Sequence, residues 1–519
     1  MSYDYIIVGA GAAGAILAAR LTEDPKVSVL LLEAGHDYPD VESLPDELKY
    51  GYGSEKLNVM GDVTSKHRWT FVARATGEAS PMLVPRGKVT GGSTAINAMI
   101  FLRGVPDDYD RWASWGNDQW TFQDLLPYFR KLETDTDYAD DFHGTDGPII
   151  VRRFKPDEWL VDEKAFYEAC RAYGFADCPD HNSPDSTGVG PTPFNHPNRI
   201  RWSTNIGYLG MARHRLNLTI RGECLVRRVV FDGDRAVGVE VESGGEVFTV
   251  HAAEIVLSGG PIGSPQILML SGVGPPDNLN ELGIPVVHEL PGVGQNLRDH
   301  PQVQVLWRTK ASFDQDITAP RLQFTLRYTA TGSEFINDML VHPLSAATGR
   351  TVHGGDPLVP IGIGMTCTLD LAVGSGDLRL RSDDPKTQPF LDYNFLEEEF
   401  DRQRLREAVR ICVELAEYEG LRAIIDERLH PSDEALESDD ALDAWMMRQV
   451  TTSHHISGTC KMGPDSDPAA VVDQYGNVHG LRGLRVVDAS IMPDCIRANT
   501  NVTTMMIGER VADMIKQGD

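Results

Sequence analysis

The 519-residue sequence has little of what marks a membrane or secreted protein. No uninterrupted apolar run reaches the ~18 residues that a membrane-spanning helix needs, so we expect no membrane span. The chain enters a strand-like apolar pattern within its first residues. No basic segment, apolar segment and cleavage site stand before that pattern, and we therefore predict no secretory signal.

Cysteines are few and are not arranged in pairs. The seven cysteines are scattered and none belongs to a C-x-x-C motif: Cys170, Cys178, Cys224, Cys367, Cys412, Cys460 and Cys495. This pattern excludes a disulfide framework and a cysteine-based zinc site, and it favours free thiols in a reducing compartment. Together with the missing secretory signal, it predicts a cytoplasmic protein.

Basic residues are also fewer than acidic residues. Lysine and arginine number 48 against 76 acidic residues, which leaves a net charge of −28. Such a surface repels nucleic acid and anionic lipid, so we expect neither as a partner. The acidity is interpreted as surface solvation, with a salt-adapted host as the alternative. The apolar fraction of 41% is ordinary for a globular protein, and the length predicts about two domains at ~150 residues each.

The most informative motif lies at the start of the chain. An apolar run ends in Gly9, Gly11 and Gly14, and a small-residue helix pattern follows. A second apolar run ends at Glu33, about 20 residues on, where dinucleotide-binding units place the acid that holds ribose hydroxyls. The pattern predicts a βαβ unit that binds a dinucleotide at a helix N-terminus. An ordinary βαβ unit with a glycine turn is the alternative.

A second stretch, residues 85–104, is dense in small residues and contains Asn97. Small residues allow the backbone to approach a large planar ligand closely. Taken alone, the stretch fits a tight contact between helices equally well.

Three long motifs in this order resemble the glucose–methanol–choline (GMC) flavoprotein oxidoreductases. They are residues 85–104, 259–274 and 290–300, and the resemblance extends from Tyr5 to Ile515. It implies an α/β fold with a Rossmann-like FAD-binding domain. It also implies a substrate domain in which helices flank an antiparallel sheet.

The resemblance divides the chain into discontinuous domains. We assign residues 1–150, 215–300 and 452–519 to the FAD-binding domain, and residues 151–214 and 301–451 to the substrate domain. Local patterns predict a helix ending near Leu132 with Thr121 as its N-cap, and a hairpin turn at residues 232–234. They also predict strands at 302–307, 323–328, 358–365 and 377–382, and a helix over 398–419.

The expected chemistry lies in residues 452–463 and 484–510. Alcohol oxidation removes a proton from the hydroxyl and a hydride from the carbon, and a histidine is the natural base near neutral pH. The resemblance implies that His455 is this base and that Asn499 is its partner. That pair is typical of the subgroup with choline oxidases and hydroxymethylfurfural oxidases. Its local sequence alone favours a structural histidine at His455, and the resemblance reverses that preference.

The resemblance also implies a set of FAD contacts. They are Gly9, Gly11, Gly14, Glu33, Val89, Gly92, Asn97, Met99, Val226, Asp488, Ala489, Asn501 and Val502. Some family members bind the flavin covalently through a histidine just before the signature asparagine. Ile96 stands there in this sequence, so we expect a non-covalent FAD.

His454 is predicted to line the substrate pocket. The pair His454–His455 could suggest a metal site, but neighbouring residues on a strand point to opposite faces and no third ligand is spaced nearby. We therefore predict no metal.

The expected reaction is FAD-dependent oxidation of a primary alcohol to an aldehyde, with electrons passing to O2 or a quinone-type acceptor. Ser453 stands where known oxidases often carry an aliphatic residue, which favours an acceptor other than oxygen. Two alternatives stay open: a hydroxynitrile lyase-like enzyme of the same fold, and a nucleotide-binding protein without catalysis. The pattern in residues 301–451 is too weak to place the substrate pocket.

Overall fold

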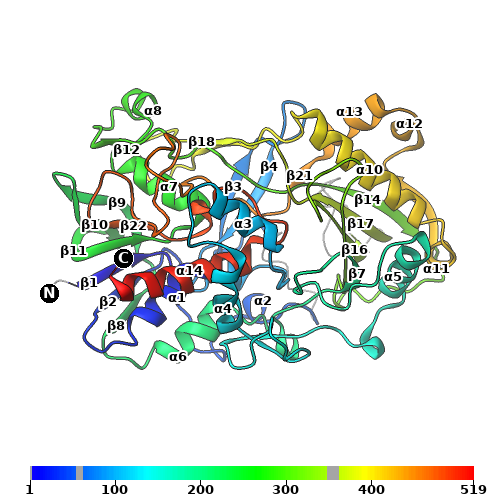
Figure 1. The fold of residues 1–519 in the computed structure, drawn as a ribbon, viewed down its shortest axis with the longest axis horizontal. Coiled ribbons are helices and arrows are strands. Elements are labelled where there is room, and N and C mark those ends of the chain that lie inside the picture. Colours follow the sequence, from blue (N-terminus) through cyan, green and yellow to red (C-terminus); the bar gives the residue numbers. More distant parts are fainter. Residues whose placement is uncertain (1–2, 54–61, 348–361, 519) are drawn as a thin grey trace.

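A computed structural model describes residues 3–53, 62–347 and 362–518 of the chain. It contains two large sheets of different construction, one toward each end of the molecule in Figure 1. The mixture of helices and sheets confirms the predicted α/β class.

The first sheet is built around parallel strands. Its order is β8-β2-β1-β11-β10-β9, and β22 also pairs with β11. The strands span Leu218–Arg221 (β8), Val29–Leu32 (β2), Tyr3–Val8 (β1), Glu246–Leu257 (β11), Arg235–Ser243 (β10), Leu225–Asp232 (β9) and Leu484–Val486 (β22). All four residues of β2 are apolar and buried, as expected of a parallel strand covered on both faces.

Two helices from opposite ends of the sequence cover this sheet side by side. They are α1 (Ala12–Leu21) and α14 (Thr500–Gln517), blue and red in Figure 1. Their backbones approach closely, since a Cβ on Gly508 would lie 3.1 Å from Cα of Ala13. The buried Glu509 carboxylate accepts hydrogen bonds from Arg20 at 2.7 Å and from the Tyr208 hydroxyl at 2.6 Å. These contacts fix the C-terminal helix against the helix that follows the glycine turn.

The second sheet pairs its strands antiparallel. Its order is β20-β14-β17-β16-β15-β7, and β21 also pairs with β14. The strands span Ile425–His430 (β20), Pro301–Thr309 (β14), Gly362–Leu369 (β17), Met339–Ala347 (β16), Phe324–Tyr328 (β15), Gly188–Pro191 (β7) and Thr451–Thr452 (β21). Helices α5 (Val161–Tyr173) and α10 (Glu399–Leu415) pack against it.

Smaller elements connect the two sheets. The helices are α2 (Asp46–Lys49), α3 (Pro106–Ser114), α4 (Phe122–Leu132), α6 (Gly210–Ala212), α7 (Gly260–Leu270), α8 (Pro276–Glu281), α11 (Glu419–Ile424), α12 (Asp433–Leu436) and α13 (Asp439–Gln449). The strand pairs are β3 (Arg68–Ala73) with β4 (Met82–Gly87), β5 (Glu133–Asp135) with β6 (Ile149–Val151), β12 (Val273–Gly274) with β13 (His288–Glu289), and β18 (Asp377–Arg379) with β19 (Phe390–Asp392).

Several local predictions are confirmed. The Thr121 side chain accepts from the Asp124 amide at the start of α4, and β9 and β10 form the hairpin that turns at residues 232–235. The helix expected over 398–419 ends earlier, at Leu415, and α11 begins at Glu419. Strand β16 was not predicted. Residues 358–361 of one expected strand lie outside the described residues.

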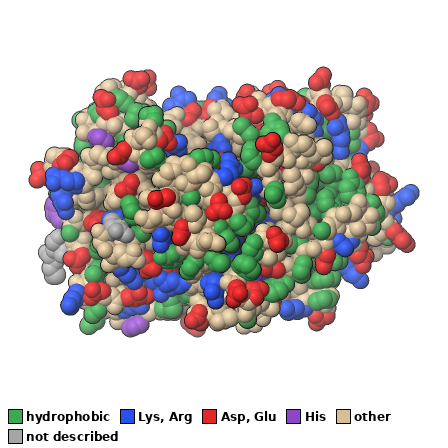
Figure 2. Space-filling model, viewed as in Figure 1, with side chains coloured by type: hydrophobic (Ala, Val, Ile, Leu, Met, Phe, Trp, Pro, Cys, Tyr) green, Lys and Arg blue, Asp and Glu red, His purple; other side chains and the backbone are tan. Residues whose placement is uncertain are grey.

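Acidic and basic side chains mix over the face shown in Figure 2, where the net charge does not form one patch. Arginine–carboxylate pairs at the surface, such as Arg482 with Asp234, offset part of the acidic charge. Within the described ranges, no helix has the length and apolar character needed to cross a membrane.

Candidate functional site

A cavity of about 560 Å³ lies where the two sheets meet. At one end its walls include Gly9, Gly11, Glu33 and Val226, which we call the nucleotide end. At the other end they include His455 and Asn499 together with residues of β14, β16 and β17, which we call the reaction end. The volume lies within the range of ~300–1,000 Å³ usual for ligand sites.

The glycine turn at the nucleotide end leaves no room for side chains. Gly9 has a positive φ of +100°, and a Cβ there would lie 2.3 Å from the carbonyl oxygen of Ser258. A Cβ on Gly92 would lie 2.7 Å from Cα of Gly11, so the turn and the 85–104 segment touch backbone to backbone. Helix α1 starts after Gly11 without a side-chain cap. Its first N–H groups therefore remain available to an anionic group in the cavity.

Two acids at this end are held by backbone amides. Glu33 accepts from the amides of Ala10 at 3.0 Å and Gly35 at 2.9 Å. Burial raises the Glu33 pKa to about 7. Asp488 accepts from the Gly260 amide at 2.9 Å, which ties it to the start of α7. Each carboxylate keeps further lone pairs for a ligand hydroxyl.

The structure brings most of the predicted FAD contacts to the cavity wall. These are Gly9, Gly11, Glu33, Gly92, Asn97, Met99, Val226, Asp488, Ala489 and Asn501. Three others do not line it. Gly14 packs under the turn, where a Cβ would lie 1.9 Å from the Gly9 carbonyl oxygen. Val89 belongs to a small separate hydrophobic cluster, and Val502 is fully buried in the main core.

These residues fit the FAD that the resemblance implies. Gly9, Gly11 and Gly92 present backbone without side chains to the cavity, and the helix N-terminus beside them suits a diphosphate. Nδ2 of Asn501 is buried on the cavity wall and has no hydrogen-bond partner among the described residues. A polar ring edge with an acceptor atom would satisfy this amide.

The predicted catalytic pair is in direct contact at the reaction end. Nδ2 of Asn499 lies 2.8 Å from Nε2 of His455. On the other side of the imidazole, Nδ1 lies 2.9 Å from Nδ1 of His300. An amide N–H donates, so the Asn499 contact leaves the lone pair of His455 on Nε2. The proton is then on Nδ1, where it is donated to His300.

Asp299 holds the backbone that carries His455. Its Oδ1 accepts from the His455 amide at 2.9 Å, and its Oδ2 accepts from the Thr452 hydroxyl at 2.5 Å. The same hydroxyl accepts from the His454 amide at 2.7 Å. Arg86 donates to the His454 carbonyl at 2.7 Å. The base therefore lies on a segment that is fixed from two directions.

One sequence argument about this segment is wrong. The two adjacent histidines were expected to point to opposite faces of a strand, but both line the cavity. The reason is a left-handed residue: His454 has φ +65°, which turns the chain after β21. The placement of His454 in the pocket wall does follow the prediction.

Burial keeps the histidines of the reaction end neutral. Burial, with the adjacent His300, His454 and Arg86, holds the pKa of His455 well below its usual range. Burial likewise lowers the pKa of His300 to about 4 and that of His454 to about 3. A neutral imidazole with its lone pair on Nε2 can accept a proton, which a base must do.

Sequence reasoning missed several residues of the reaction end. Oδ1 of Asp370 lies 3.5 Å from Nδ1 of His300, and burial raises the Asp370 pKa to about 8. Asp299 and His300 close the third motif of the sequence, so their presence there was a signal, but their contact with His455 spans more than 150 residues. His342 lies on β16 and Asp370 directly follows β17, and the sequence did not show how these strands pair.

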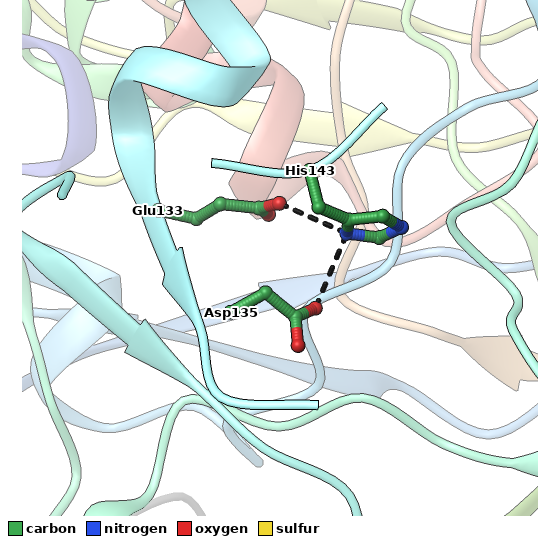
Figure 3. A group of neighbouring side chains, drawn as sticks. All are labelled: Glu133, Asp135 and His143. Atoms are coloured by element: carbon green, nitrogen blue, oxygen red, sulfur yellow. Dashed lines mark hydrogen bonds and ion pairs between the residues drawn. The ribbon is translucent and has the colours of Figure 1, made fainter. Parts of the chain in front are cut away.

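A second cluster of ionisable side chains lies outside the cavity wall. Figure 3 shows Glu133 and Asp135 pointing at Nδ1 of His143, at 3.1 and 3.2 Å. Nε2 of His143 lies 2.9 Å from Asp180. Burial opposes the charge of His143, but hydrogen bonds to these carboxylates outweigh it and raise the pKa to about 11.

This spacing of ligand atoms would suit a metal ion, but the charges are already balanced. Arg103 pairs with Glu133 at 2.6 Å, and Arg153 pairs with Asp135 at 2.9 Å and with Asp180 at 2.6 Å. Both nitrogens of the protonated imidazole donate, so neither offers a lone pair to a metal. The cluster is a buried ionic network, and Arg103 connects it to the segment of residues 85–104.

Comparisons with known proteins identify the family of the chain. Two family models described as GMC oxidoreductase match residues 3–302 and 372–508. Human mitochondrial choline dehydrogenase is 38% identical, with 99% of this chain and 90% of that protein covered. The oxygen-dependent choline dehydrogenase of Escherichia coli is 37% identical, with 99% and 96% covered.

Solved structures extend the similarity. Pyridoxine 4-oxidase from Mesorbium loti superposes with a TM-score of 0.91 at 28% identity, covering 99% of both chains. A fungal aryl-alcohol oxidase shares the fold at a TM-score of 0.85 and 23% identity, with 100% of this chain and 99% of that chain covered. The chain belongs to the GMC oxidoreductase family, and its activity is the FAD-dependent oxidation of an alcohol.

Proposed function

We propose that this enzyme oxidises a primary alcohol to an aldehyde, with His455 as the base and Asn499 as the group that orients the alcohol oxygen. The observation that carries the proposal is the contact of 2.8 Å between Nδ2 of Asn499 and Nε2 of His455 on the cavity wall. An alcohol oxygen beside this pair would give its proton to Nε2 and accept a hydrogen bond from the amide.

His300 acts as a positioning residue in this proposal. It accepts the Nδ1 proton of His455 at 2.9 Å, which keeps the Nε2 lone pair directed at Asn499. Asp299 fixes the backbone of the base through the His455 amide. After proton transfer, His455 carries a positive charge. The carboxyl group of Asp370, 3.5 Å from His300, lies at the far end of this chain of side-chain contacts.

The bound FAD would supply the acceptor for the hydride that the alcohol carbon releases. The glycine turn, the N-terminus of α1, Glu33 and Asn501 would hold it. We propose that it is bound without a covalent link, because Ile96 stands on the cavity wall where a histidine would be needed.

Two further observations bear on the electron acceptor and on the location of the enzyme. Ser453 donates to Oε1 of Gln302 at 3.0 Å, so a polar contact stands beside the base where an aliphatic side chain would favour oxygen. We propose a quinone-type acceptor in preference to O2. The seven cysteines are all free and buried, which supports a reducing, cytoplasmic location.

A lyase reaction is not favoured. The relatives include dehydrogenases and oxidases that act on alcohols, and a lyase would need no hydride acceptor.

The experiment that tests the proposed function is anaerobic mixing of the yellow protein with a panel of primary alcohols. Flavin bleaching by one or more alcohols supports the proposal, and an unchanged flavin spectrum with every alcohol contradicts it. Acid precipitation of the protein should leave all the flavin in solution if the FAD is non-covalent.

A further inference from the structure

One wall of the reaction end is a face of the antiparallel sheet, and much of it is polar. The cavity-facing side chains of β14, β17 and β16 include Gln302, Gln304, Thr366, Thr368 and His342. Pairing sets them in two rows across the sheet. Gln302 lies opposite Thr368, while Gln304 lies opposite Thr366, which in turn lies opposite His342. The rows are therefore a continuous surface and not isolated polar groups.

In the first row, Gln302 makes its hydrogen bonds within the protein. Gln302 donates to the Thr452 carbonyl at 3.0 Å and accepts from Ser453 at 3.0 Å. Both groups of its side-chain amide are thereby used to hold the segment that precedes His455. Gln302 lies on β14, two residues after His300, which corresponds to roughly 7 Å along a strand.

In the second row, His342 and Thr366 offer hydrogen-bonding groups to the cavity. Nδ1 of His342 lies 3.2 Å from the Thr325 hydroxyl and 3.3 Å from the carbonyl oxygen of Phe324. The hydroxyl can accept as well as donate, but the carbonyl can only accept, so both contacts are satisfied with the ring proton on Nδ1. Nε2 of His342 is then an acceptor on a residue that lines the cavity. Gln304 donates to the Thr366 hydroxyl at 3.4 Å, which leaves the hydroxyl able to donate its own proton. One acceptor and one donor are therefore adjacent on the same wall.

The same wall does not suit a cationic substrate. Quaternary ammonium groups are recognised by aromatic faces or by carboxylates. The carboxyl group of Asp370 lines the reaction end, but burial raises its pKa to about 8, so it is uncharged at pH 7. Among the described residues on the cavity wall, the tryptophan, tyrosine and phenylalanine side chains are Trp69 and Phe71 on β3. The ring of Trp69 is already covered by the Lys88 ammonium, 4.5 Å from its centroid. Arg86 adds a buried positive charge beside His454.

We propose that the substrate is a neutral alcohol that carries a second hydrogen-bonding group, and that His342 and Thr366 recognise this group. The inference rests on the proposed function, because the oxidised hydroxyl must lie at His455 and Asn499. It separates this enzyme from its choline dehydrogenase relatives, whose substrate carries a quaternary ammonium group and no hydrogen-bonding group beyond its hydroxyl.

Two matched pairs of alcohols test the inference with the purified holoenzyme. Choline and 3,3-dimethylbutan-1-ol have the same shape and differ in charge. Benzyl alcohol and 3-hydroxybenzyl alcohol differ by one hydroxyl group. We expect kcat/KM for choline to be no higher than for its neutral isostere. We expect the added hydroxyl of the aryl pair to raise kcat/KM about tenfold, the gain from roughly one hydrogen bond.

Variants assign that gain to the second row. Thr366→Val has the shape of threonine without its hydroxyl, and His342→Phe removes the Nε2 acceptor. Each should reduce the ratio within the aryl pair toward one. Leu344→Met, on the apolar part of the same wall, should leave the ratio unchanged. Because each ratio is taken within one protein, a partial loss of folded enzyme does not alter it.

The outcomes are distinct. A higher kcat/KM for choline than for its isostere, or an aryl ratio near one in the wild type, would overturn the substrate inference while alcohol oxidation stands. An aryl ratio that stays near ten in both variants would overturn the roles of His342 and Thr366. An unreduced flavin with all four alcohols would overturn the proposed function as well.

Discussion

The two ends of the cavity are built in different ways. The nucleotide end is made by backbone: Gly9, Gly11 and Gly92 meet without side chains, and the helix that follows offers its N–H groups. The reaction end is made by side chains on strands whose partners lie far apart in the sequence, such as Gln304 and Thr366. At Gly9 and Gly92 an added Cβ would collide with backbone, whereas a side-chain wall can be changed without loss of the fold.

The largest effect is therefore expected at the nucleotide end. In Gly14→Ala the new Cβ would lie 1.9 Å from the Gly9 carbonyl oxygen, so helix α1 must move away from the turn. We expect a protein without bound flavin, measured as the ratio of absorbance at 450 nm and 280 nm. Gly77→Ala is the control, since a Cβ there meets nothing within 4 Å. A yellow, fully loaded Gly14→Ala protein would show that the turn is less tight than described.

At the reaction end, Asn499→Leu should reduce catalysis and leave the flavin bound. It removes the donor that faces Nε2 of His455, and loss of one such donor typically costs about 10²-fold in kcat. Asn499 precedes α14 but its side chain makes no capping hydrogen bond, so helix stability is not at stake. Thermal denaturation serves as the control. A change confined to KM would indicate a binding role without a role in the chemical step.

A smaller effect should come from Asp370→Asn. Burial raises the Asp370 pKa to about 8, so the group is neutral below that pH and becomes a carboxylate above it. The new charge, 3.5 Å from His300, favours the proton that His455 accepts, and kcat/KM should rise by less than about tenfold through pH 8.

The Asp370→Asn variant should lack this rise, and its kcat/KM should depend on pH as in the wild type at lower pH. If the inflection near pH 8 persists in Asp370→Asn, another group is responsible for it.

The cluster around His143 provides a third region, where buried charge affects stability and not chemistry. Its pKa of about 11 lies above the unfolded value of 6.5, so the folded protein holds the proton more tightly. The stability it contributes is complete below pH 6.5 and is lost as the pH rises toward 11.

His143→Gln should therefore be less stable than the wild type at pH 7, and the difference should shrink between pH 7 and 10. The limit for one proton is about 1.4 kcal/mol per pH unit, measured by urea denaturation. A difference independent of pH would mean that His143 is not charged in the folded protein.

The same contrast explains what the sequence could reveal. The glycine turn, Glu33 and Asn97 are local signals, and the structure places all of them on the wall of one cavity. His455 and Asn499 were found through the family resemblance, and their contact now adds geometry to that prediction. Gly14, Val89 and Val502 do not line the cavity, because motif membership reflects packing as well as ligand contact.

The rest of the reaction end could not be predicted because it depends on strand pairing. Strand β16 contains Pro343 and small residues, and its pattern does not alternate clearly, so it was not recognised. Without it, His342 could not be placed opposite Thr366. His300 and Asp299 were visible as part of a motif, but their contact with His455 is set by the pairing of β14 with β21.

The most direct test of the central claim is the rate of flavin reduction in His455→Gln under anaerobic conditions, with a saturating alcohol and His454→Gln as the matched control. Both histidines line the cavity, but only the Nε2 of His455 faces Asn499 among the described contacts. We predict a fall of at least about 10²-fold for His455→Gln and a fall below about tenfold for His454→Gln, with flavin retained in both. Reduction of His455→Gln at the wild-type rate would contradict the assignment of the base.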